Sequence, residues 1–395
     1  MAHRDAEYIS VLMKPKIAIV RGKFLNRYEM QFFEPLVKRY DITAFGSLTP
    51  YHDRFAFPVV KLTSPMDLPN FPYKMAILNR LFTDAHYLWG LEERLKGFDL
   101  VHTAETYFHY TQQCLNAKKK GYVKKVIATV LENIPYNNEA IWGRRAFKRR
   151  ARTELDHIIA LTQKTKDALV IEGCEPSKIT IIGHYVDTQR FKPIDNRRMR
   201  TFHKKIRILF VGRLEEYKGV FDVLEVAKIL INDSELATYS LQFLFVGEGG
   251  EVRKMRGMEQ KLGIGRFVEH RSVSYGQIPV VYQSADIFVA PSKTQFLRGK
   301  PTWEEQYNTT LLEAQASGLP IVATKSGGIP ENVGDSAILV EPGDVKTLAY
   351  AIKQFIVNEK LRLIYTKKAR KRAETVHDAK IGANKLARLY EQILH

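Results

Sequence analysis

Short apolar runs alternate along this chain with longer segments of helical periodicity. The first run, residues 16–20, passes through a loop that contains Gly22 into a helical pattern over residues 28–40. Further strand-like runs in the first half are residues 99–102, 125–131, 157–161 and 179–182. Apolar strands separated by helices are typical of a parallel sheet that is buried on both faces. The first half therefore predicts a doubly wound α/β domain.

The same opening recurs after residues 193–205, a stretch rich in Pro, Asp, Asn and Arg that we interpret as a linker. A strand over residues 206–211 leads through Gly212 into a helix over residues 220–231. Later strands are expected at residues 241–246, 286–290 and 319–324. We predict two Rossmann-like domains that face a central cleft: residues 1–192, joined by a returning C-terminal helix at about 378–395, and residues 206–377.

Composition agrees with two cytoplasmic domains. The chain has 395 residues, of which 45% are hydrophobic and 26% charged, as in ordinary soluble proteins of this size. The two cysteines, Cys114 and Cys174, are too few for a disulfide framework or a metal cluster and suit a reducing compartment. Residues 1–8 do not resemble a signal peptide, and no apolar run approaches the ~20 residues of a membrane-spanning helix.

The net charge of +18 leaves three interpretations open. The basic residues concentrate at residues 118–120, 124–125, 144–152 and 197–200. A charged, solvated surface is the simplest explanation. Peripheral contact with the anionic inner face of the cell membrane is the second, and the aromatic segment 73–89 favours it. Nucleic-acid binding is not expected, because no recognised nucleic-acid module accompanies the charge.

Candidate chemistry begins at Gly212–Gly219, a loop between a strand and a helix. Arg213 and Lys218 lie five positions apart in this loop and can converge on one anion at the carboxyl edge of a parallel sheet. A diphosphate fits such a pair. The alternative is a basic turn with ordinary surface residues.

A second candidate anion site lies near residue 309, where a helix is expected to begin. Asn308 or Thr309 can cap this helix, and the free amides at its start can bind phosphate. Glu313, one turn along, can accept hydrogen bonds from a ribose diol, and Glu305 in the preceding loop can accept them from sugar hydroxyls. The alternative is that both are surface glutamates, as we expect for Glu304.

Five segments carry these residues in a fixed order. They are Gly212-Arg-Leu with Lys218-Gly, Ala285-Asp with Pro291-Ser, Glu305-Gln-Tyr-Asn with Leu-Leu-Glu313-Ala, Ser317-Gly-Leu-Pro-Ile-Val, and Gly327-Gly-Ile-Pro-Glu331. Together they resemble the C-terminal domain of retaining glycosyltransferases of family 4, which have the GT-B fold. The resemblance is strongest over about residues 206–345. The segment 185–193 is similar to the stretch before that family's linker.

The resemblance implies roles for individual residues. Arg213 and Lys218 would bind the donor diphosphate and stabilise the leaving group, Glu305 would hold the transferred sugar, and Glu313 would bind the ribose. The remaining donor-binding residues implied are Gly22, Arg271, Val273, Tyr307, Asn308, Thr309 and Thr310. Of these, Arg271 and Val273 would lie against the base, and Gly22 matches the glycine-rich loop of the N-terminal domain.

The chain also departs from the family pattern. Asn308 occupies a position where glycine is usual. Many members carry a histidine after the strand that ends at Val130, where this chain has Glu132 nearby. Glu132, His102 and His109 are therefore acceptor-side candidates, with a purely structural role as the alternative for each.

No Asp-x-Asp sequence occurs, so we predict no metal and no cofactor. The negative charge of the leaving group would then be neutralised by Arg213, Lys218 and the helix N-terminus, in keeping with the metal independence of the family.

The expected function is a retaining glycosyltransferase that moves a sugar from a UDP-, GDP- or ADP-linked donor to a hydroxyl of a sugar, glycan or lipid-linked acceptor. Such enzymes act in the synthesis of cell-surface glycans, lipid-linked glycans or glycolipids. The usual proposal for the family is same-face attack, in which the departing phosphate takes the acceptor proton.

Other classes remain open. They include a nucleotide-sugar epimerase of the same fold, a phosphorylase with a lysine-bound pyridoxal cofactor, and a non-catalytic nucleotide-sugar-binding protein. A dehydrogenase is disfavoured because Gly247–Gly250 is not a G-x-G-x-x-G motif.

Overall fold

The computed structural model describes residues 14–194 and 204–395 and separates into two compact units. Unit 1 extends to Gly183 and includes Gly382–His395, and unit 2 is His184–Ile381. The division falls a few residues before the expected position 192. Residues 1–8, the basic cluster at 197–200 and most of the proposed linker lie outside the described residues.

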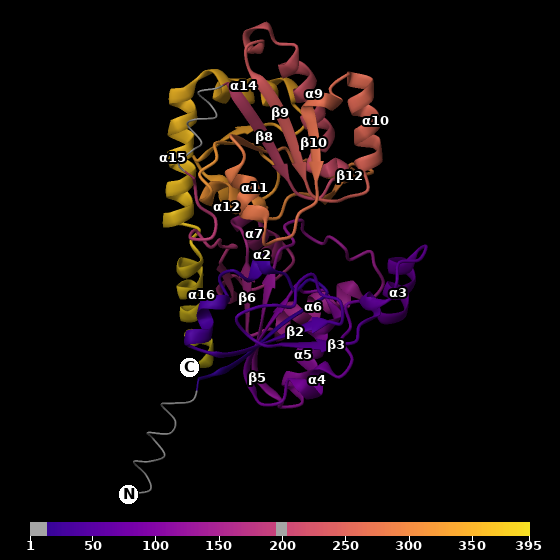
Figure 1. Cartoon of the computed structure of the whole chain (residues 1–395). Coiled ribbons are helices and arrows are strands. Elements are labelled where there is room, and N and C mark those ends of the chain that lie inside the picture. The colour runs from indigo at the N-terminus through magenta and orange to yellow at the C-terminus, as the bar shows by residue number, and fades with distance from the viewer. Residues whose placement is uncertain (1–13, 195–203) are drawn as a thin grey trace, which may run out of the picture. The chain divides into compact units, whose positions relative to one another are not determined.

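Unit 1 contains a seven-stranded sheet in the order β3-β2-β1-β4-β5-β6-β7, and every neighbouring pair is parallel (Figure 1). The strands are β1 (Lys16–Gly22), β2 (Asp41–Ser47), β3 (Val59–Leu62), β4 (Phe98–Ala104), β5 (Val123–Val130), β6 (His157–Ala160) and β7 (Ile179–Ile181). The α-helices are α2 (Arg27–Met30), α3 (Lys74–Phe82), α4 (Leu91–Arg94), α5 (His109–Lys119), α6 (Arg144–Glu154) and α7 (Gln163–Ile171). Short 3₁₀ helices are η1 (Glu34–Lys38), η2 (Pro65–Asp67) and η3 (Pro176–Lys178).

The helix expected over residues 28–40 is not continuous. It consists of the four-residue α2 followed by the 3₁₀ helix η1, with Pro35 near the start of η1. Proline has no amide hydrogen, and its ring collides with the carbonyl four residues earlier in an α-helix. The apolar spacing of this segment was therefore sufficient to bury Met30 and Leu36, but it could not maintain one helix across Pro35.

Unit 2 repeats the architecture with a six-stranded sheet in the order β10-β9-β8-β11-β14-β15, again parallel throughout. The strands are β8 (Lys205–Val211), β9 (Ser240–Val246), β10 (Val268–Arg271), β11 (Ile287–Ala290), β14 (Ile321–Thr324) and β15 (Ala337–Val340). The prediction of two parallel Rossmann-like sheets is confirmed.

The helices of unit 2 are α9 (Val220–Ile231), α10 (Val252–Leu262), α11 (Ile278–Gln283), α12 (Thr309–Ala316), α13 (Ile329–Val333), α14 (Val345–Val357) and α15 (Glu359–Thr375), with the 3₁₀ helices η4 (Glu216–Lys218), η5 (Ser234–Leu236) and η6 (Gly265–Phe267). A separate antiparallel hairpin, β12 (Gln295–Leu297) with β13 (Lys300–Trp303), is inserted between β11 and α12. Each unit has its own buried apolar core on its sheet.

The final helix, α16 (Ala379–Leu394), returns to unit 1 as predicted (Figure 1). The hydroxyl of Tyr40 donates to the carbonyl of Ala387 at 3.1 Å, and the Tyr390 hydroxyl lies 2.7 Å from Nδ1 of His102 on β4. Leu386, Ala387 and Tyr390 are buried in this contact. Among the described helices, α16 included, none is long and apolar enough to cross a membrane.

Candidate functional site

Two loops meet at the centre of the unit 2 sheet, where β8 and β11 are neighbours. One loop, residues 212–219, follows β8, and the other, residues 291–308, follows β11. The amide of Lys293 donates to the carbonyl of Tyr217 at 2.8 Å. Gly219 has a φ of +75°, and a Cβ there would lie 2.1 Å from the carbonyl oxygen of Pro291, so only glycine fits. In open parallel sheets, ligands bind at such a switch point in strand order.

The structure brings Lys218 and Glu305 together across these loops. The Nζ of Lys218 lies 2.7 Å from Oε2 of Glu305, which also accepts from the Ser292 hydroxyl at 2.8 Å. Glu305 is fixed from behind, because Gly327 leaves no room for a Cβ beside its carbonyl and the amide of Gly328 donates to that carbonyl. Folding thus brings two residues that lie 87 positions apart in the sequence into one charged, mostly buried pair.

Arg213 remains exposed beside this pair. Its guanidinium lies over the Tyr217 ring at 5.3 Å, and it forms no ion pair with any residue in the described ranges. The Nζ of Lys218 lies 4.9 Å from the centre of the Trp303 ring, which in turn contacts Tyr217 at 4.2 Å. Trp303 was not among the predicted site residues, because its contact with Lys218 depends on the inserted hairpin. Arg213 is therefore available to an incoming anion.

The start of α12 lies next to Glu305. Asn308 has a φ of +58°, a conformation that glycine and asparagine adopt most readily, which explains why asparagine can stand where the family has glycine. The expected side-chain cap is absent: Oδ1 of Asn308 accepts from the Thr310 hydroxyl at 2.6 Å and takes no helix amide. The first amides of a helix have no partner within the helix, so those of Thr309 and Thr310 can face a phosphate.

Glu313 is not a surface residue of unit 2. It is buried and accepts from the Tyr282 hydroxyl at 2.8 Å. Burial raises the pKa of Glu313 to about 7, against the opposing effects of the Tyr282 hydrogen bond and of Arg190. The expectation that Glu304 is a surface residue is wrong, since its exposed fraction is 6%. The backbone of the neighbouring Glu305 packs against the turn at residues 326–328, which holds this segment inside unit 2.

The remaining donor-side candidates lie apart from Lys218. Arg271 is exposed at the carboxyl end of β10 and pairs with Glu269, and Val273 is half-buried two residues later. Tyr307 is buried, and its ring contacts those of His184 and His377. Tyr307 therefore packs inside unit 2, whereas Arg271 is accessible at a sheet edge.

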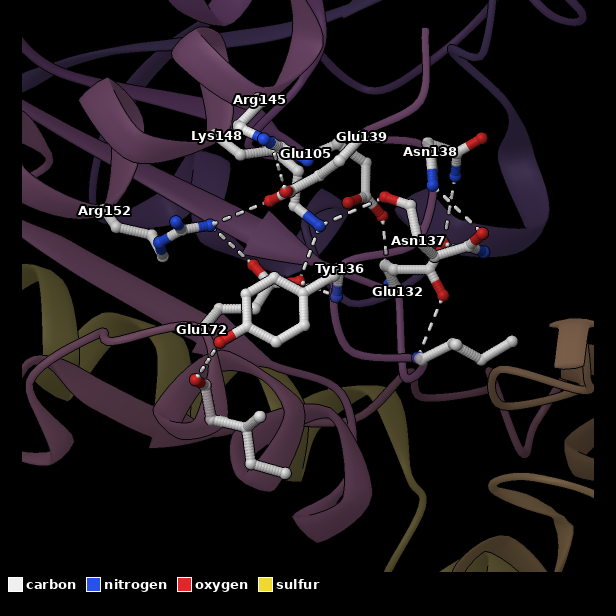
Figure 2. Close-up of polar contacts among 12 residues, drawn as sticks. Glu105, Glu132, Tyr136, Asn137, Asn138, Glu139, Arg145, Lys148, Arg152 and Glu172 are labelled. Atoms are coloured by element: carbon white, nitrogen blue, oxygen red, sulfur yellow. Dashed lines mark hydrogen bonds and ion pairs between the residues drawn. The ribbon is translucent and has the colours of Figure 1, made fainter. Parts of the chain in front are cut away.

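In unit 1, Gly22 ends β1 and Glu132 follows β5 at the same carboxyl edge. Figure 2 shows Glu132 among the polar side chains of the loop at residues 131–139. Its carboxylate accepts from the amide of Ile134 at 3.0 Å and from the side chains of Asn137 and Asn138 at 2.8 and 3.2 Å. Burial raises the pKa of Glu132. These contacts give the residue a loop-ordering role in this structure.

His102 and His109 are both engaged in internal contacts. The Nε2 of His102 lies 2.6 Å from the Thr129 hydroxyl and its Nδ1 contacts Tyr390, so this ring connects β4, β5 and α16. Burial holds the pKa of His102 well below the usual range. Nδ1 of His109 lies 2.7 Å from the carbonyl of Phe82, and burial lowers the pKa of His109 as well.

Three buried polar residues of unit 1, namely Asp84, His86 and Glu105, were not among the predicted site residues. Asp84 pairs with His86 at 2.9 Å and with Arg144 at 2.6 Å. Glu105 accepts from the amides of Leu131 and Glu132 at 2.8 and 3.2 Å. Glu105 directly follows a strand, as Glu132 does, and that position is the signal that could have identified it. Within residues 14–194 and 204–395, no group of three or more His, Cys, Asp or Glu side chains is placed to hold a metal ion.

Each of the two units matches a known family of glycosyltransferases. Residues 32–190 match the family described as Glycosyltransferase Family 4, and residues 192–372 match Glycosyl transferases group 1. A D-inositol 3-phosphate glycosyltransferase of Corynebacterium jeikeium is 28% identical over 255 residues, which are 60% of this chain and 57% of the relative. The capsular polysaccharide biosynthesis glycosyltransferase CapM of Staphylococcus aureus is 24% identical over 249 residues, 60% of this chain and 62% of CapM. The match thus spans somewhat more than half the length of these relatives.

Solved structures share the fold. Anabaena HepE, in complex with UDP and glucose, superposes with a TM-score of 0.75 at 17% identity, covering 96% of this chain and 100% of HepE. WaaG, a glycosyltransferase involved in lipopolysaccharide biosynthesis, gives a TM-score of 0.69 at 17% identity, with 94% and 99% covered. The two family matches together cover nearly all of both units, and the chain belongs to the glycosyltransferases of family 4, with the GT-B fold.

Proposed function

We propose that this protein is a retaining, metal-independent glycosyltransferase that uses a nucleoside diphosphate sugar as donor. The observation that carries the proposal is the Lys218–Glu305 pair at the β8/β11 switch point, beside the N-terminus of α12 and the exposed Arg213. A cation pair suits the diphosphate, a fixed carboxylate suits sugar hydroxyls, and helix amides suit phosphate oxygens. Glu313, one turn into α12, would accept from the ribose, and Arg271 would lie near the base.

Leaving-group stabilisation is the main task of these residues. Before the donor binds, Lys218 is neutralised by Glu305. A bound diphosphate competes for Lys218 and adds Arg213, so that negative charge developing on the phosphate meets two cations and the α12 amides. Removing one such donor typically costs about 100- to 1,000-fold in rate.

In the proposed transfer, the bond between the anomeric carbon and the donor phosphate oxygen breaks, and a bond from that carbon to the acceptor oxygen forms on the same face. The acceptor proton passes to the departing phosphate, which leaves as the nucleoside diphosphate. Glu305 orients the sugar throughout and does not become covalently attached to it. HepE in complex with UDP and glucose supports a UDP-linked donor for a protein of this fold.

The decisive experiment has two stages. Thermal-shift measurements with UDP, GDP and ADP identify the base, and NMR of the products formed from the corresponding sugars reports transfer and anomeric configuration. Transfer with retained configuration supports the proposal. An inverted product, or turnover that requires an added divalent cation and stops with chelator, contradicts it.

Two alternatives give different products in the same assay. An epimerase would release the nucleoside diphosphate and an altered sugar without any acceptor. A non-catalytic binding protein would show the thermal shift with no turnover.

For the acceptor, we propose a sugar or lipid-linked glycan presented at an anionic membrane. Helix α3 lies at the periphery of unit 1 (Figure 1). Large apolar side chains of residues 68–81, on and before this helix, are exposed. Tyr73 is 82% and Leu81 70% exposed. Such side chains, together with the net charge of +18, favour adsorption to anionic lipid. Flotation with phosphatidylglycerol vesicles at low salt tests this, and failure to float would instead indicate a soluble acceptor.

A further inference from the structure

The switch point of the unit 1 sheet lies between β1 and β4. Gly22 is the last residue of β1 and Glu105 directly follows β4, so both lie at the carboxyl edge of this pair of neighbouring strands. Glu105 has a φ of +58°, which is uncommon for a residue with a side chain. This edge is the position where a parallel sheet of this order binds ligands.

The two carboxyl oxygens of Glu105 have different environments. Oε1 accepts from the backbone amides of Leu131 and Glu132. Oε2 is buried and has no hydrogen-bond partner among the residues that the structure describes. The side chain is 4% exposed. Buried polar atoms are almost always paired, so an oxygen of this kind calls for a ligand or solvent partner.

Two more buried polar atoms without a described partner belong to Tyr110 and His86, and the charge of Glu105 contributes to the raised pKa of Tyr110. The ring of Tyr110 packs against Gly22, and its hydroxyl is unpaired within the described part of the chain. His86 lies 6.4 Å from Tyr110 between ring centres, and its Nε2 is also unpaired there, while Nδ1 contacts Asp84. With Nδ1 donating to Asp84, a neutral His86 presents Nε2 as an acceptor.

Glu105 has the character of a hydrogen-bond donor. Burial, followed by repulsion from Glu132, raises the pKa of Glu105 to about 8, against the attraction of Lys148 and the two amide hydrogen bonds. Since Oε1 already accepts two hydrogens, the proton belongs on Oε2. A carboxylic acid kept neutral by its site can donate a hydrogen bond at neutral pH.

We propose that Glu105, Tyr110 and His86 form a subsite in unit 1 that binds the hydroxyl groups of a polyol or sugar acceptor. This rests on the proposed function, because it assigns the acceptor side of the same reaction. A hydroxyl accepts from Oε2 of Glu105 and donates to Nε2 of His86, and Tyr110 can do either. The half-buried ring of Phe24 stacks on His86 at 4.9 Å and must turn aside when the acceptor enters. Glu105, Tyr110 and His86 are positioning residues.

The loop that carries Glu132 is braced by a separate charge network (Figure 2). Lys148 on α6 pairs with Glu172 at 2.5 Å, and Arg152 pairs with the other oxygen of Glu172 at 2.7 Å. The groups that act on Glu105 are Glu132 and Lys148, and the pKa of its neighbours Tyr107 and Tyr110 is raised well above the usual range. Neither tyrosine therefore titrates near pH 8. Charged groups also face the other two members of the subsite, because Arg21 acts on Tyr110 and His86 pairs with Asp84, which Arg144 also contacts.

The test compares two substitutions of Glu105. Glu105→Ala removes the donor and should raise the acceptor KM about tenfold, the effect of one lost hydrogen bond of ordinary strength, with the donor KM unchanged. Glu105→Gln keeps an acceptor at Oε1 and an NH₂ donor at the Oε2 position, so it should restore the acceptor KM. In the wild type, acceptor kcat/KM should fall as the pH rises above about 8, whereas Glu105→Gln should show no such fall.

The probes are myo-inositol, D-inositol 3-phosphate, glucose and N-acetylglucosamine, used with the donor that the protein turns over. Tyr110→Phe should raise the acceptor KM about threefold, consistent with the weaker end of hydrogen-bond energies. Tyr390→Phe, a matched buried tyrosine of unit 1, should leave it unchanged. An unchanged acceptor KM in Glu105→Ala, or an alkaline fall retained in Glu105→Gln, would overturn the subsite.

Calorimetry separates this proposal from the proposed function. Binding of a polyol probe that is lost in Glu105→Ala and kept in Glu105→Gln supports the subsite even if no donor is turned over. Equal binding by all three proteins contradicts it. UDP binding and the unfolding temperature, measured on each variant, identify a misfolded protein.

Discussion

The two sheets share one strand order around their switch points, but the groups at these two points differ in charge and exposure. In unit 2, the β8/β11 edge carries the exposed Arg213 and the Lys218–Glu305 ion pair. In unit 1, the β1/β4 edge carries Glu105, buried and with a raised pKa. The same backbone topology thus presents an exposed cation beside an ion pair in unit 2 and a buried carboxyl group with a raised pKa in unit 1.

The difference shows that topology selects where a ligand binds, and side chains select what binds. A diphosphate needs compensating charge, which unit 2 supplies. A neutral hydroxyl needs no compensating charge and is bound by hydrogen-bond donors and acceptors. Four predictions test this contrast, from the largest expected effect to the smallest.

Lys218→Ala should lower kcat about 1,000-fold, because one of the two cations that stabilise the leaving group is lost. Initial rates of nucleoside diphosphate release measure this, and Lys228→Ala on the exposed side of α9 is the matched control. A rate within threefold of the wild type would remove Lys218 from the site.

Lys148→Met should destabilise unit 1 by about 3 kcal/mol, since it leaves Glu172 with a buried charge that is only partly paired. Denaturant unfolding measures the loss. The exposed Lys119→Met is the control and should change stability by less than about 0.5 kcal/mol. Equal stabilities would mean that the network of Figure 2 does not brace the loop.

Acidification should weaken the contact of α16 with unit 1 through His102. Its pKa is depressed in the folded state, so below its unfolded value of about 6.5 the unfolded chain binds a proton that the folded chain does not. The free energy of unfolding should therefore fall by up to about 1.4 kcal/mol per pH unit below that point. Unfolding curves at several pH values should show a steeper fall for the wild type than for His102→Gln. Parallel pH dependences would contradict this account.

Asn308→Gly should change stability by no more than about 0.5 kcal/mol, because glycine also adopts the φ of +58°. Asn308→Ala should cost about 1 kcal/mol, the price of a left-handed residue with a Cβ. Thermal unfolding of the two variants side by side is the measurement. A glycine variant less stable than the alanine variant would show that the Asn308 side chain, through Thr310 and Glu305, matters more than its backbone.

Much of the unit 2 site could be predicted, because its residues belong to ordered local motifs. Arg213 and Lys218 flank a turn that follows a strand, and Glu305 precedes a helix start, so their spacing alone placed them at one edge. Trp303 could not be predicted, since it reaches Lys218 through the inserted hairpin. The prediction of one helix over residues 28–40 was wrong. The apolar spacing of this segment is that of a helix, but Pro35 prevents a continuous one.

The unit 1 site depended on contacts between residues distant in sequence. His102 was a candidate for chemistry, yet its partners, Thr129 and Tyr390, lie 27 and 288 residues away. Glu105 and Glu132 are separated by a strand and a helix, and only the pairing of β4 with β5 makes them neighbours.

The sequence by itself determined two parallel sheets, the returning C-terminal helix and the cationic loop of unit 2. These depend on periodicity and on turn residues, which are local properties of the chain. Tertiary structure decided which carboxyl groups are ionised and which polar atoms lack partners. Burial and neighbouring charge set a pKa, and both come from residues brought together by folding. Glu105 shows this, because its place directly after a strand marks it as a residue of the sheet edge but does not reveal its burial or its raised pKa.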